Sequence, residues 1–366
     1  MIFNTNEILG RSIKLDNGLE YRWFSGTDYL GMAHHDDFKE FLDQGINQFG
    51  LHYGSSRNGS LRVAIYEEAE SQLATFTHSP SSTIISSGMW AGQLLHKEIE
   101  KIARQHLTDR SNKINIRYHY APNVHPALWG NDYKQEQATW PEWAKNTVTL
   151  IESLPDCIHL ILTDTVGSPQ VELLDFSVFQ KLPTSENIWM IADDSHGMGV
   201  LGREGNGSYQ TIRNHFKSNL IVIASLNKAL GIPAGAIFSE KWIIETIQKS
   251  PFFAGASPAL PSYMHVLSQL ISGGIYQKQY RLLGQRIDQF NIGLGTSRIL
   301  TGIANYPVYN SSSPTLFQYL ESNRILVSNF SYPRPTDAPL TRLAINALHT
   351  EKDIEELVKK CLDFPQ

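Results

Sequence analysis

Residues 221–238, IVIASLNKALGIPAGAIF, decide the fold and carry the first chemical clue in this chain of 366 residues. The segment begins as an apolar run typical of a buried β-strand and ends in a turn rich in Gly and Pro. Lys228 follows the strand. Burying a lysine is unfavourable unless its amine has a task, and an amine whose pKa is lowered by burial readily forms a Schiff base with an aldehyde. By itself, the segment favours a loop lysine that points into water, because lone lysines after strands are common.

A second stretch, residues 187–202 (NIWMIADDSHGMGVLG), has the same organisation. Its apolar run ends at Asp193 and Asp194, and His196 follows in a Gly-rich loop. In open α/β sheets ligands bind where the carboxyl ends of parallel strands meet. An aspartate facing a lysine there is what pyridoxal phosphate requires, because the carboxylate keeps the pyridine nitrogen protonated while the lysine holds the aldehyde. The Asp-x-x-His spacing is also that of a metal pair, although no clear third ligand is present.

Composition limits the other classes of function. With 41% apolar and 18% charged residues, the chain has the composition of a globular protein with one large and one smaller domain. A net charge of -5 provides no basic surface, so we expect no nucleic-acid partner. We also expect no secretory signal and no membrane span, since the N-terminus lacks a basic start followed by an apolar core. The 2 cysteines form no disulfide or zinc pattern, which favours a cytoplasmic location.

Strands and helices alternate from residue 83 onward, which predicts an α/β fold with a mostly parallel, mixed sheet. Gly88 opens a helix directly after a short strand, and a helix N-terminus in that position suits a phosphate group. Residues 251–261 mark a boundary, followed by a long helical stretch to about residue 290 and then an α+β arrangement. We therefore expect an N-terminal segment (1–45), a large cofactor-binding domain (46–255) and a small C-terminal domain (256–366).

Four strings occur in order along the chain: TDYLGMAHH, YGSSRNG, DDSHGMGVLG and SLNKALG. Together they resemble the α-oxoamine synthase family of fold-type I enzymes that use pyridoxal 5'-phosphate. The resemblance extends from about residue 24 to the last helix, and the string with two aspartates, together with the later lysine, is its most specific part. It implies a fold-type I transferase, and a homodimer whose site lies at the subunit interface.

The resemblance also assigns roles to individual residues. It implies that Lys228 binds the cofactor aldehyde and moves the α-proton, that Asp193 contacts the ring nitrogen, and that His125 stacks on the ring. The remaining implied contacts are with the ring oxygen (His196, Ser168), with the phosphate (Gly88, Met89, Ser225) and with the substrate carboxylate (Arg342). Without the resemblance, His125 is an ordinary loop histidine and Arg342 an ordinary surface arginine.

The family activity is the condensation of an amino acid with an acyl-CoA or similar acyl thioester to an α-amino ketone, so the resemblance implies an acyltransferase. Two alternatives remain open: another pyridoxal-phosphate reaction on this fold, such as transamination, decarboxylation or aldol cleavage, and a catalytically silent binding protein. The chain departs from the family pattern where acyl-donor entry and the neighbouring subunit's phosphate contact are expected, at Thr27, Leu61, Met89, Ala254 and Gly255.

Overall fold

A six-stranded mixed sheet forms the centre of the protein in a computed structural model that describes residues 2–107, 114–331, 336 and 339–365. The strand order is β3-β8-β7-β6-β5-β4. Strands β4 to β7 run parallel, whereas β8 is antiparallel to both of its neighbours. The predicted fold class is confirmed. The strands are β3 (Ser81–Ile85), β4 (Ile116–Tyr120), β5 (Ile158–Asp164), β6 (Ile188–Asp193), β7 (Asn219–Ser225) and β8 (Gly235–Ser239).

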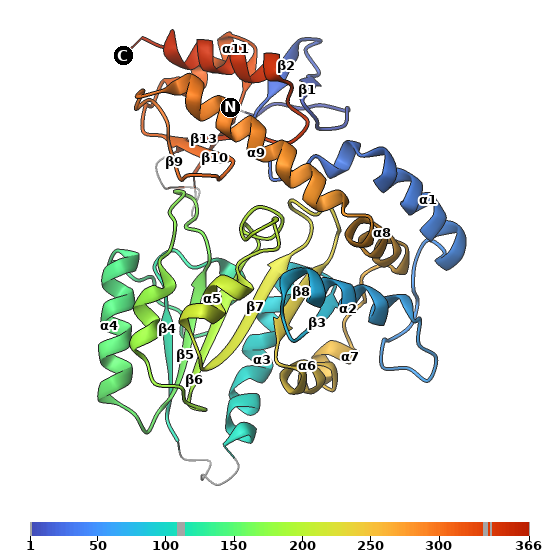
Figure 1. The fold of residues 1–366 in the computed structure, drawn as a ribbon, viewed down its shortest axis with the longest axis vertical. Coiled ribbons are helices and arrows are strands. Elements are labelled where there is room, and N and C mark those ends of the chain that lie inside the picture. Colours follow the sequence, from blue (N-terminus) through green and yellow to red (C-terminus); the bar gives the residue numbers. More distant parts are fainter. Residues whose placement is uncertain (1, 108–113, 332–335, 337–338, 366) are drawn as a thin grey trace.

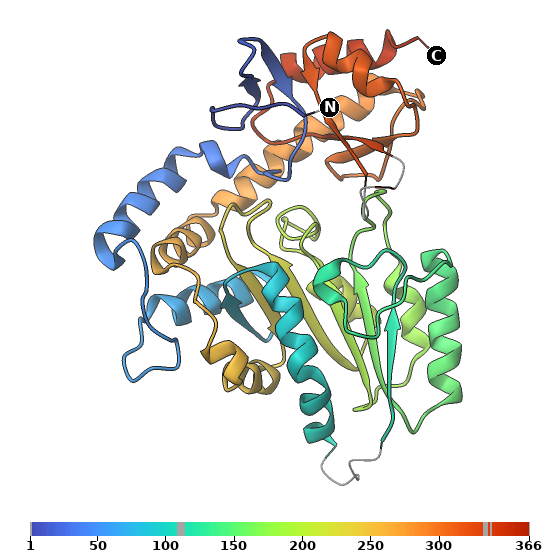
Figure 2. The same cartoon turned by 180° about the vertical axis from the view of Figure 1, so that it is seen from behind.

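Helices cover both faces of this sheet, with α5 on one face and α3 on the other (Figures 1 and 2). Every residue of β6 is buried, as expected of a strand between two helical layers, and this explains its unbroken apolar run. The helices around the sheet are α2 (Ile65–Thr77), α3 (Gly88–His106), α4 (Trp140–Ser153), α5 (Tyr209–His215), α6 (Lys241–Gln248) and α7 (Pro251–Ala254), with the short 3-10 helices η2 (Pro126–Leu128) and η3 (Phe176–Lys181).

A second, four-stranded sheet of order β12-β13-β10-β9 lies in the C-terminal part of the chain. The parallel strands of the large sheet point toward this part (Figure 2). Its elements are β9 (Thr301–Gly302), β10 (Val308–Ser311), β12 (Ser328–Phe330), β13 (Leu340–Ala344), α9 (Ile275–Leu294), α10 (Leu316–Ser322) and α11 (Glu351–Leu362). The small sheet is therefore placed to close over the carboxyl ends of the large one.

The helical stretch predicted to run to about residue 290 is two helices, α8 (Pro261–Ser272) and α9. Gly273 and Gly274 interrupt it, and Gly274 has a φ of 65°, a left-handed conformation that ends helical geometry and that glycine adopts without steric cost. The helical spacing of apolar residues resumes directly after these two glycines, so the prediction of one continuous helical stretch was wrong at this point.

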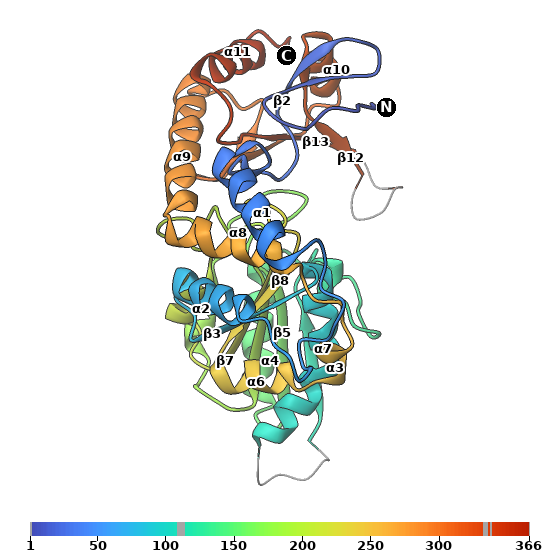
Figure 3. The same ribbon diagram turned by 90° about the vertical axis from the view of Figure 1, so that its right-hand side faces the viewer.

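The N-terminal segment packs on the C-terminal part of the chain. Strands β1 (Ser12–Lys14) and β2 (Glu20–Trp23) form a sheet with β11 (Ile325–Leu326), followed by η1 (Met32–His34) and α1 (Asp36–Phe49) (Figure 3). The division into 1–45, 46–255 and 256–366 stays a prediction. No helix of the described ranges is both long and apolar enough to span a bilayer.

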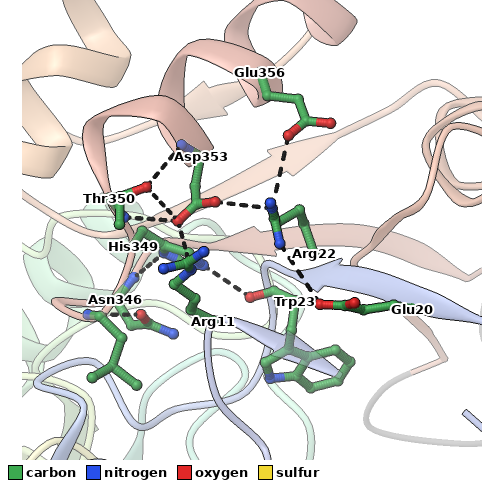
Figure 4. Close-up of polar contacts among 10 residues, drawn as sticks. Arg11, Glu20, Arg22, Trp23, Asn346, His349, Thr350, Asp353 and Glu356 are labelled. Atoms are coloured by element: carbon green, nitrogen blue, oxygen red, sulfur yellow. Dashed lines mark hydrogen bonds and ion pairs between the residues drawn. The ribbon is translucent and has the colours of Figure 1, made fainter. Parts of the chain in front are cut away.

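Asp353 joins the two ends of the chain (Figure 4). Its carboxylate accepts hydrogen bonds from the main-chain N–H and the hydroxyl of Thr350, both at 2.8 Å, and caps α11. It also forms ion pairs with Arg22 at 2.9 Å and with Arg11 at 3.1 Å, while its own side chain is 1% exposed. Burial raises the pKa of Asp353, but the Thr350 hydrogen bonds and the two guanidinium groups outweigh burial and hold this pKa below 3.8.

We expect Asp353→Asn to lower the free energy of unfolding by about 2–3 kcal/mol, because it weakens a helix cap and removes the buried counter-charge shared by Arg11 and Arg22. Arg22 keeps its longer ion pairs with Glu356 and Glu20. A carboxyl with a depressed folded-state pKa stabilises the fold above its unfolded pKa and loses this effect as the pH falls through the folded value. The difference between the proteins should therefore shrink below pH 3.8. Urea unfolding measures the free energy of unfolding of each protein, and Glu355→Gln, at an exposed position of the same helix, is the control. Equal stability of the two variants at pH 7 would contradict the stabilising role of Asp353.

Candidate active site

The carboxyl ends of β5, β6 and β7 bring the predicted residues together. Asp164 at the end of β5 is paired in register with Asp193 at the end of β6, and Asp193 is paired with Ile223 of β7. The loop after β7 then carries Lys228 back to this edge. Asp193 and Lys228, which are predicted to bind the same cofactor ring, therefore come from two adjacent parallel strands: Asp193 ends β6, and Lys228 lies in the loop after β7.

A small cavity lies at this edge of the sheet. It contains five of the predicted residues and several that were not predicted; its lining is Asn123, His125, Asp164, Val166, Ser168, Asp193, Ser195, His196 and Lys228. A more voluminous groove of about 1250 Å³ lies between α2 and α6, but its lining contains none of the predicted residues. We place the candidate site at the smaller cavity because titratable groups of both charges converge there.

Lys228 lies in the cavity wall, and its side-chain amine forms no hydrogen bond or ion pair with any residue of the described ranges. Burial lowers the pKa of this amine; the carboxylates of Asp193 and Asp164 act in the opposite direction, and Arg342 lowers the pKa further. A desolvated amine with a lowered pKa and no fixed partner is suited to act as a nucleophile and as a base.

Asp193 presents one carboxylate oxygen to the cavity. Its Oδ1 accepts the main-chain N–H of Ser195 at 2.9 Å, which fixes the carboxylate. Its Oδ2 lies 3.7 Å from Nδ1 of His125, too far for a hydrogen bond, and its side chain is 4% exposed. No described residue donates a hydrogen bond to this Oδ2, and the N–H of a protonated pyridine would supply a donor for it.

His125 is held in place by a second carboxylate. Asp164 Oδ2 accepts the main-chain N–H of His125 at 3.0 Å, and Nδ1 of His125 accepts the N–H of Ala127 at 3.2 Å. Burial lowers the pKa of His125, with Asp193 opposing and Lys228 adding to this effect. The imidazole is therefore neutral, with its proton on Nε2. Burial and the adjacent Asp193 raise the pKa of Asp164 well above its usual range.

The second aspartate of the motif has a structural role. Asp194 is fully buried and accepts hydrogen bonds from the hydroxyls of Thr165 (2.6 Å) and Ser208 (2.7 Å) and from the N–H of Ser208 (2.7 Å). Burial raises its pKa to about 6, although these hydrogen bonds act in the opposite direction. A Cβ at Gly197 would lie 2.0 Å from Asp194 Oδ1, so only glycine fits there. Asp194 thus shapes the loop that carries His196.

The predicted phosphate residues meet at the N-terminus of α3. Ser87 caps this helix by accepting the N–H of Trp90 at 3.1 Å, whereas the amides of Gly88 and Met89 precede the first intrahelical hydrogen bonds. A Cβ at Gly88 would lie 2.7 Å from the Cβ of Ser225, so glycine allows the helix end to approach the end of β7. The N–H of Ser225 donates to the cavity residue Ser195 at 2.8 Å, which links this cradle to the cavity.

Arg342 reaches the site through Tyr29. It lies on β13 of the small sheet, and its Nη2 donates to the hydroxyl of Tyr29 at 3.2 Å. That hydroxyl lies 3.3 Å from Nδ1 of His196. The hydroxyl of Tyr306 donates to the main-chain oxygen of His196 at 3.1 Å. Burial, followed by the positive charges of Lys228 and Arg342, lowers the pKa of His196 well below its usual range, so this ring is neutral.

Sequence reasoning did not assign roles to Tyr29, Tyr306 or Ser195. Tyr29 lies in the string TDYLGMAHH, which contributed to the resemblance, so a signal for it existed. Tyr306 lies in a part of the chain without a recognised motif. Of the residues that depart from the family pattern, Leu61 is 77% exposed, Met89 is 48% exposed, and the main-chain oxygen of Ala254 accepts the hydroxyl of Ser56 at 2.7 Å.

Comparisons with known proteins agree with this arrangement. No family model matches the chain. It is 26% identical over 364 residues to an 8-amino-7-oxononanoate synthase of Nitrosomonas eutropha, covering 93% of this chain and 89% of the relative. It is also 26% identical over 364 residues to 8-amino-7-oxononanoate synthase 2 of Polaromonas sp., covering 92% of this chain and 86% of the relative.

Two solved structures show the same fold. Sphingomonas wittichii serine palmitoyltransferase superposes with a TM-score of 0.77 at 16% identity, over 98% of this chain and 90% of that one. The 8-amino-7-oxononanoate synthase from Francisella tularensis gives a TM-score of 0.67 at 20% identity, over 93% of this chain and 96% of that one. The relatives confirm the predicted resemblance, and the solved structures confirm the fold class.

Proposed function

We infer that this chain is a pyridoxal-phosphate-dependent α-oxoamine synthase, an acyltransferase that condenses an amino acid with an acyl thioester to an α-amino ketone. The observation that carries the inference is that the amine of Lys228 lines the same cavity as the carboxylate of Asp193. The pKa of this amine is lowered, and among the described residues neither the amine nor Oδ2 of Asp193 has a hydrogen-bond partner. The similarity to 8-amino-7-oxononanoate synthases over most of the chain supports the reaction class.

The residues present fit the cofactor at each of its functional groups. Lys228 would hold its aldehyde carbon, Asp193 its ring nitrogen, His196 and Ser168 its ring oxygen, and Gly88, Met89 and Ser225 its phosphate. Gly88 lets the start of α3 approach Ser225 closely, because a Cβ at this position would clash with Ser225. The free main-chain N–H groups at this helix end would bind an anion such as the phosphate. When bound, pyridoxal phosphate supplies an electron sink for a carbanion at the amino acid's Cα.

The residues of this chain would position the substrate and move its proton. Arg342 binds the amino-acid carboxylate, because a guanidinium offers two parallel N–H donors to a carboxylate. Lys228 takes the proton from Cα onto Nζ, a role suited to an amine with a lowered pKa. His125, whose main-chain N–H donates to Asp164, would stack on the cofactor ring. The acyl step then forms a carbon–carbon bond between Cα and the acyl carbon and breaks the carbon–sulfur bond, which releases the thiol. Loss of the carboxylate as carbon dioxide leaves the α-amino ketone.

We further propose a homodimer, with the site completed at the subunit interface, and a cytoplasmic location. The two cysteines, Cys157 and Cys361, are buried and free, which agrees with a reducing compartment. Size-exclusion chromatography with light scattering tests the first point, and an active enzyme that stays monomeric at every concentration would contradict it.

The function is tested first by cofactor binding and then by product formation. Purified protein with added pyridoxal phosphate should develop a visible absorption band, and borohydride should remove this band and leave the cofactor's mass on Lys228. Adding an amino acid and an acyl-CoA should then release free thiol. A protein that stays colourless with excess cofactor would overturn the proposal. Amino-acid turnover without thiol release would instead favour transamination, decarboxylation or aldol cleavage.

A further inference from the structure

The hydroxyl group of Tyr29 lies between two residues that are expected to bind different molecules. It is 3.2 Å from Nη2 of Arg342, the proposed carboxylate anchor, and 3.3 Å from Nδ1 of His196, which lines the cofactor cavity. The Tyr29 ring is 1% exposed, so water does not compete for these contacts. One phenol group thus connects the substrate anchor on β13 with the cavity at the end of β6.

The direction of the two hydrogen bonds follows from what each group can donate. A guanidinium only donates, so the Tyr29 oxygen accepts from Arg342 and its single proton remains for another acceptor. Accepting from a cation polarises the phenol and strengthens it as a donor. The neighbouring Tyr306 gives its own proton to the main-chain oxygen of His196. The neutral Nδ1 of His196 is then the acceptor that faces the polarised hydroxyl of Tyr29.

We propose that Tyr29 is a positioning residue, whose hydroxyl holds His196 in the tautomer with its proton on Nε2 and couples this tautomer to Arg342. The roles of His196 and Arg342 rest on the proposed function, whereas the hydrogen bonds of Tyr29 do not depend on it. With its proton on Nε2, His196 is a neutral donor for an anionic ring oxygen. A substrate carboxylate bound to Arg342 would compete with Tyr29 for the same guanidinium N–H groups. Amino-acid binding would therefore change the hydrogen bond between Tyr29 and His196.

The tautomer can be measured without cofactor. In apo-protein labelled with ¹⁵N-histidine, long-range ¹H–¹⁵N spectra distinguish a protonated from an unprotonated Nδ1, and the signals of His196 among the 13 histidines are assigned from their loss in His196→Gln. We expect an unprotonated Nδ1 in the wild type and a mixture of tautomers in Tyr29→Phe. Tyr276→Phe is the matched control, because Tyr276 is 1% exposed and its hydroxyl donates to the Leu230 oxygen at 2.9 Å, away from His196.

In the loaded enzyme, Tyr29→Phe should raise KM for the amino acid by roughly five-fold, about the effect of one lost hydrogen bond, and shift the absorption band of the bound cofactor. Tyr276→Phe should change neither. A protonated Nδ1 in the wild type, or identical His196 signals in Tyr29→Phe and the wild type, would overturn the inference. A colourless protein whose His196 nevertheless shows the expected tautomer would refute the proposed function and leave the role of Tyr29 standing.

Discussion

Replacing Lys228 with Ala should reduce amino-acid turnover by on the order of 10³-fold or more, because one amine is expected to provide both the attachment point of the cofactor and the base. The cavity supports this double role: Lys228 is desolvated, its pKa is lowered, and no other lysine lines the cavity among the described residues. Borohydride treatment with cofactor should leave no added mass on the variant's peptide that contains position 228.

The control for this experiment is Lys241→Ala, which removes an exposed lysine whose side chain is 80% accessible and should leave turnover and labelling unchanged. Circular dichroism and thermal unfolding show whether Lys228→Ala is folded; removing an unpaired buried amine should not destabilise it. Turnover at the wild-type rate in a folded Lys228→Ala protein would contradict the proposed mechanism. Cofactor mass found on a different lysine would contradict the placement of the site.

Asp193→Asn should lower turnover by roughly 10²- to 10³-fold, the usual effect of losing one preorganised electrostatic contact in a buried site. An amide does not hold a proton on the pyridine nitrogen, so the ring is a weaker electron sink. The variant retains the shape of the side chain and an oxygen that can accept the N–H of Ser195. We therefore expect cofactor binding and fold to be affected much less than turnover.

The same variant has a predicted effect on Lys228 that needs no cofactor. The Asp193 carboxylate raises the pKa of Lys228, so its removal should lower this pKa further. The pH at which Lys228 becomes reactive toward an amine-directed reagent in the apo-protein should move to lower pH in Asp193→Asn. The exposed cap residue Asp175→Asn is the control for loss of one negative charge. An unchanged or raised pKa of Lys228 in Asp193→Asn would contradict the predicted effect of the Asp193 carboxylate on this amine.

Much of the large sheet was predictable because its signals are local. Apolar runs ending in Gly-rich loops marked β6 and β7, and the polar residues after them marked the sheet edge that carries the cavity. The order of Asp193, His196 and Lys228 along the sequence also predicted the cofactor class. The break at Gly273 and Gly274 was missed, because the helical apolar spacing resumes directly after it.

The different roles of Asp193 and Asp194 were not predictable from their types, because both follow the same strand. Which one faces the cavity depends on the position of Thr165 and Ser208, which take the carboxylate of Asp194 as a structural acceptor. The role of Arg57 in the string YGSSRNG also depends on tertiary contacts. Its two guanidinium nitrogens donate to the two carboxylate oxygens of Glu70 on α2, at 2.5 and 3.0 Å, and this buried ion pair anchors the loop away from the cavity.

By itself, the sequence determined the strand pattern, the α/β class, and the lysine and aspartate that point to pyridoxal phosphate, since each depends on neighbours a few positions away. Only the tertiary structure decided that Tyr29 lies between His196 and Arg342, which are 167 and 313 positions from it. Contacts over such separations are set by how the small sheet packs against the large one, and no local periodicity encodes that packing.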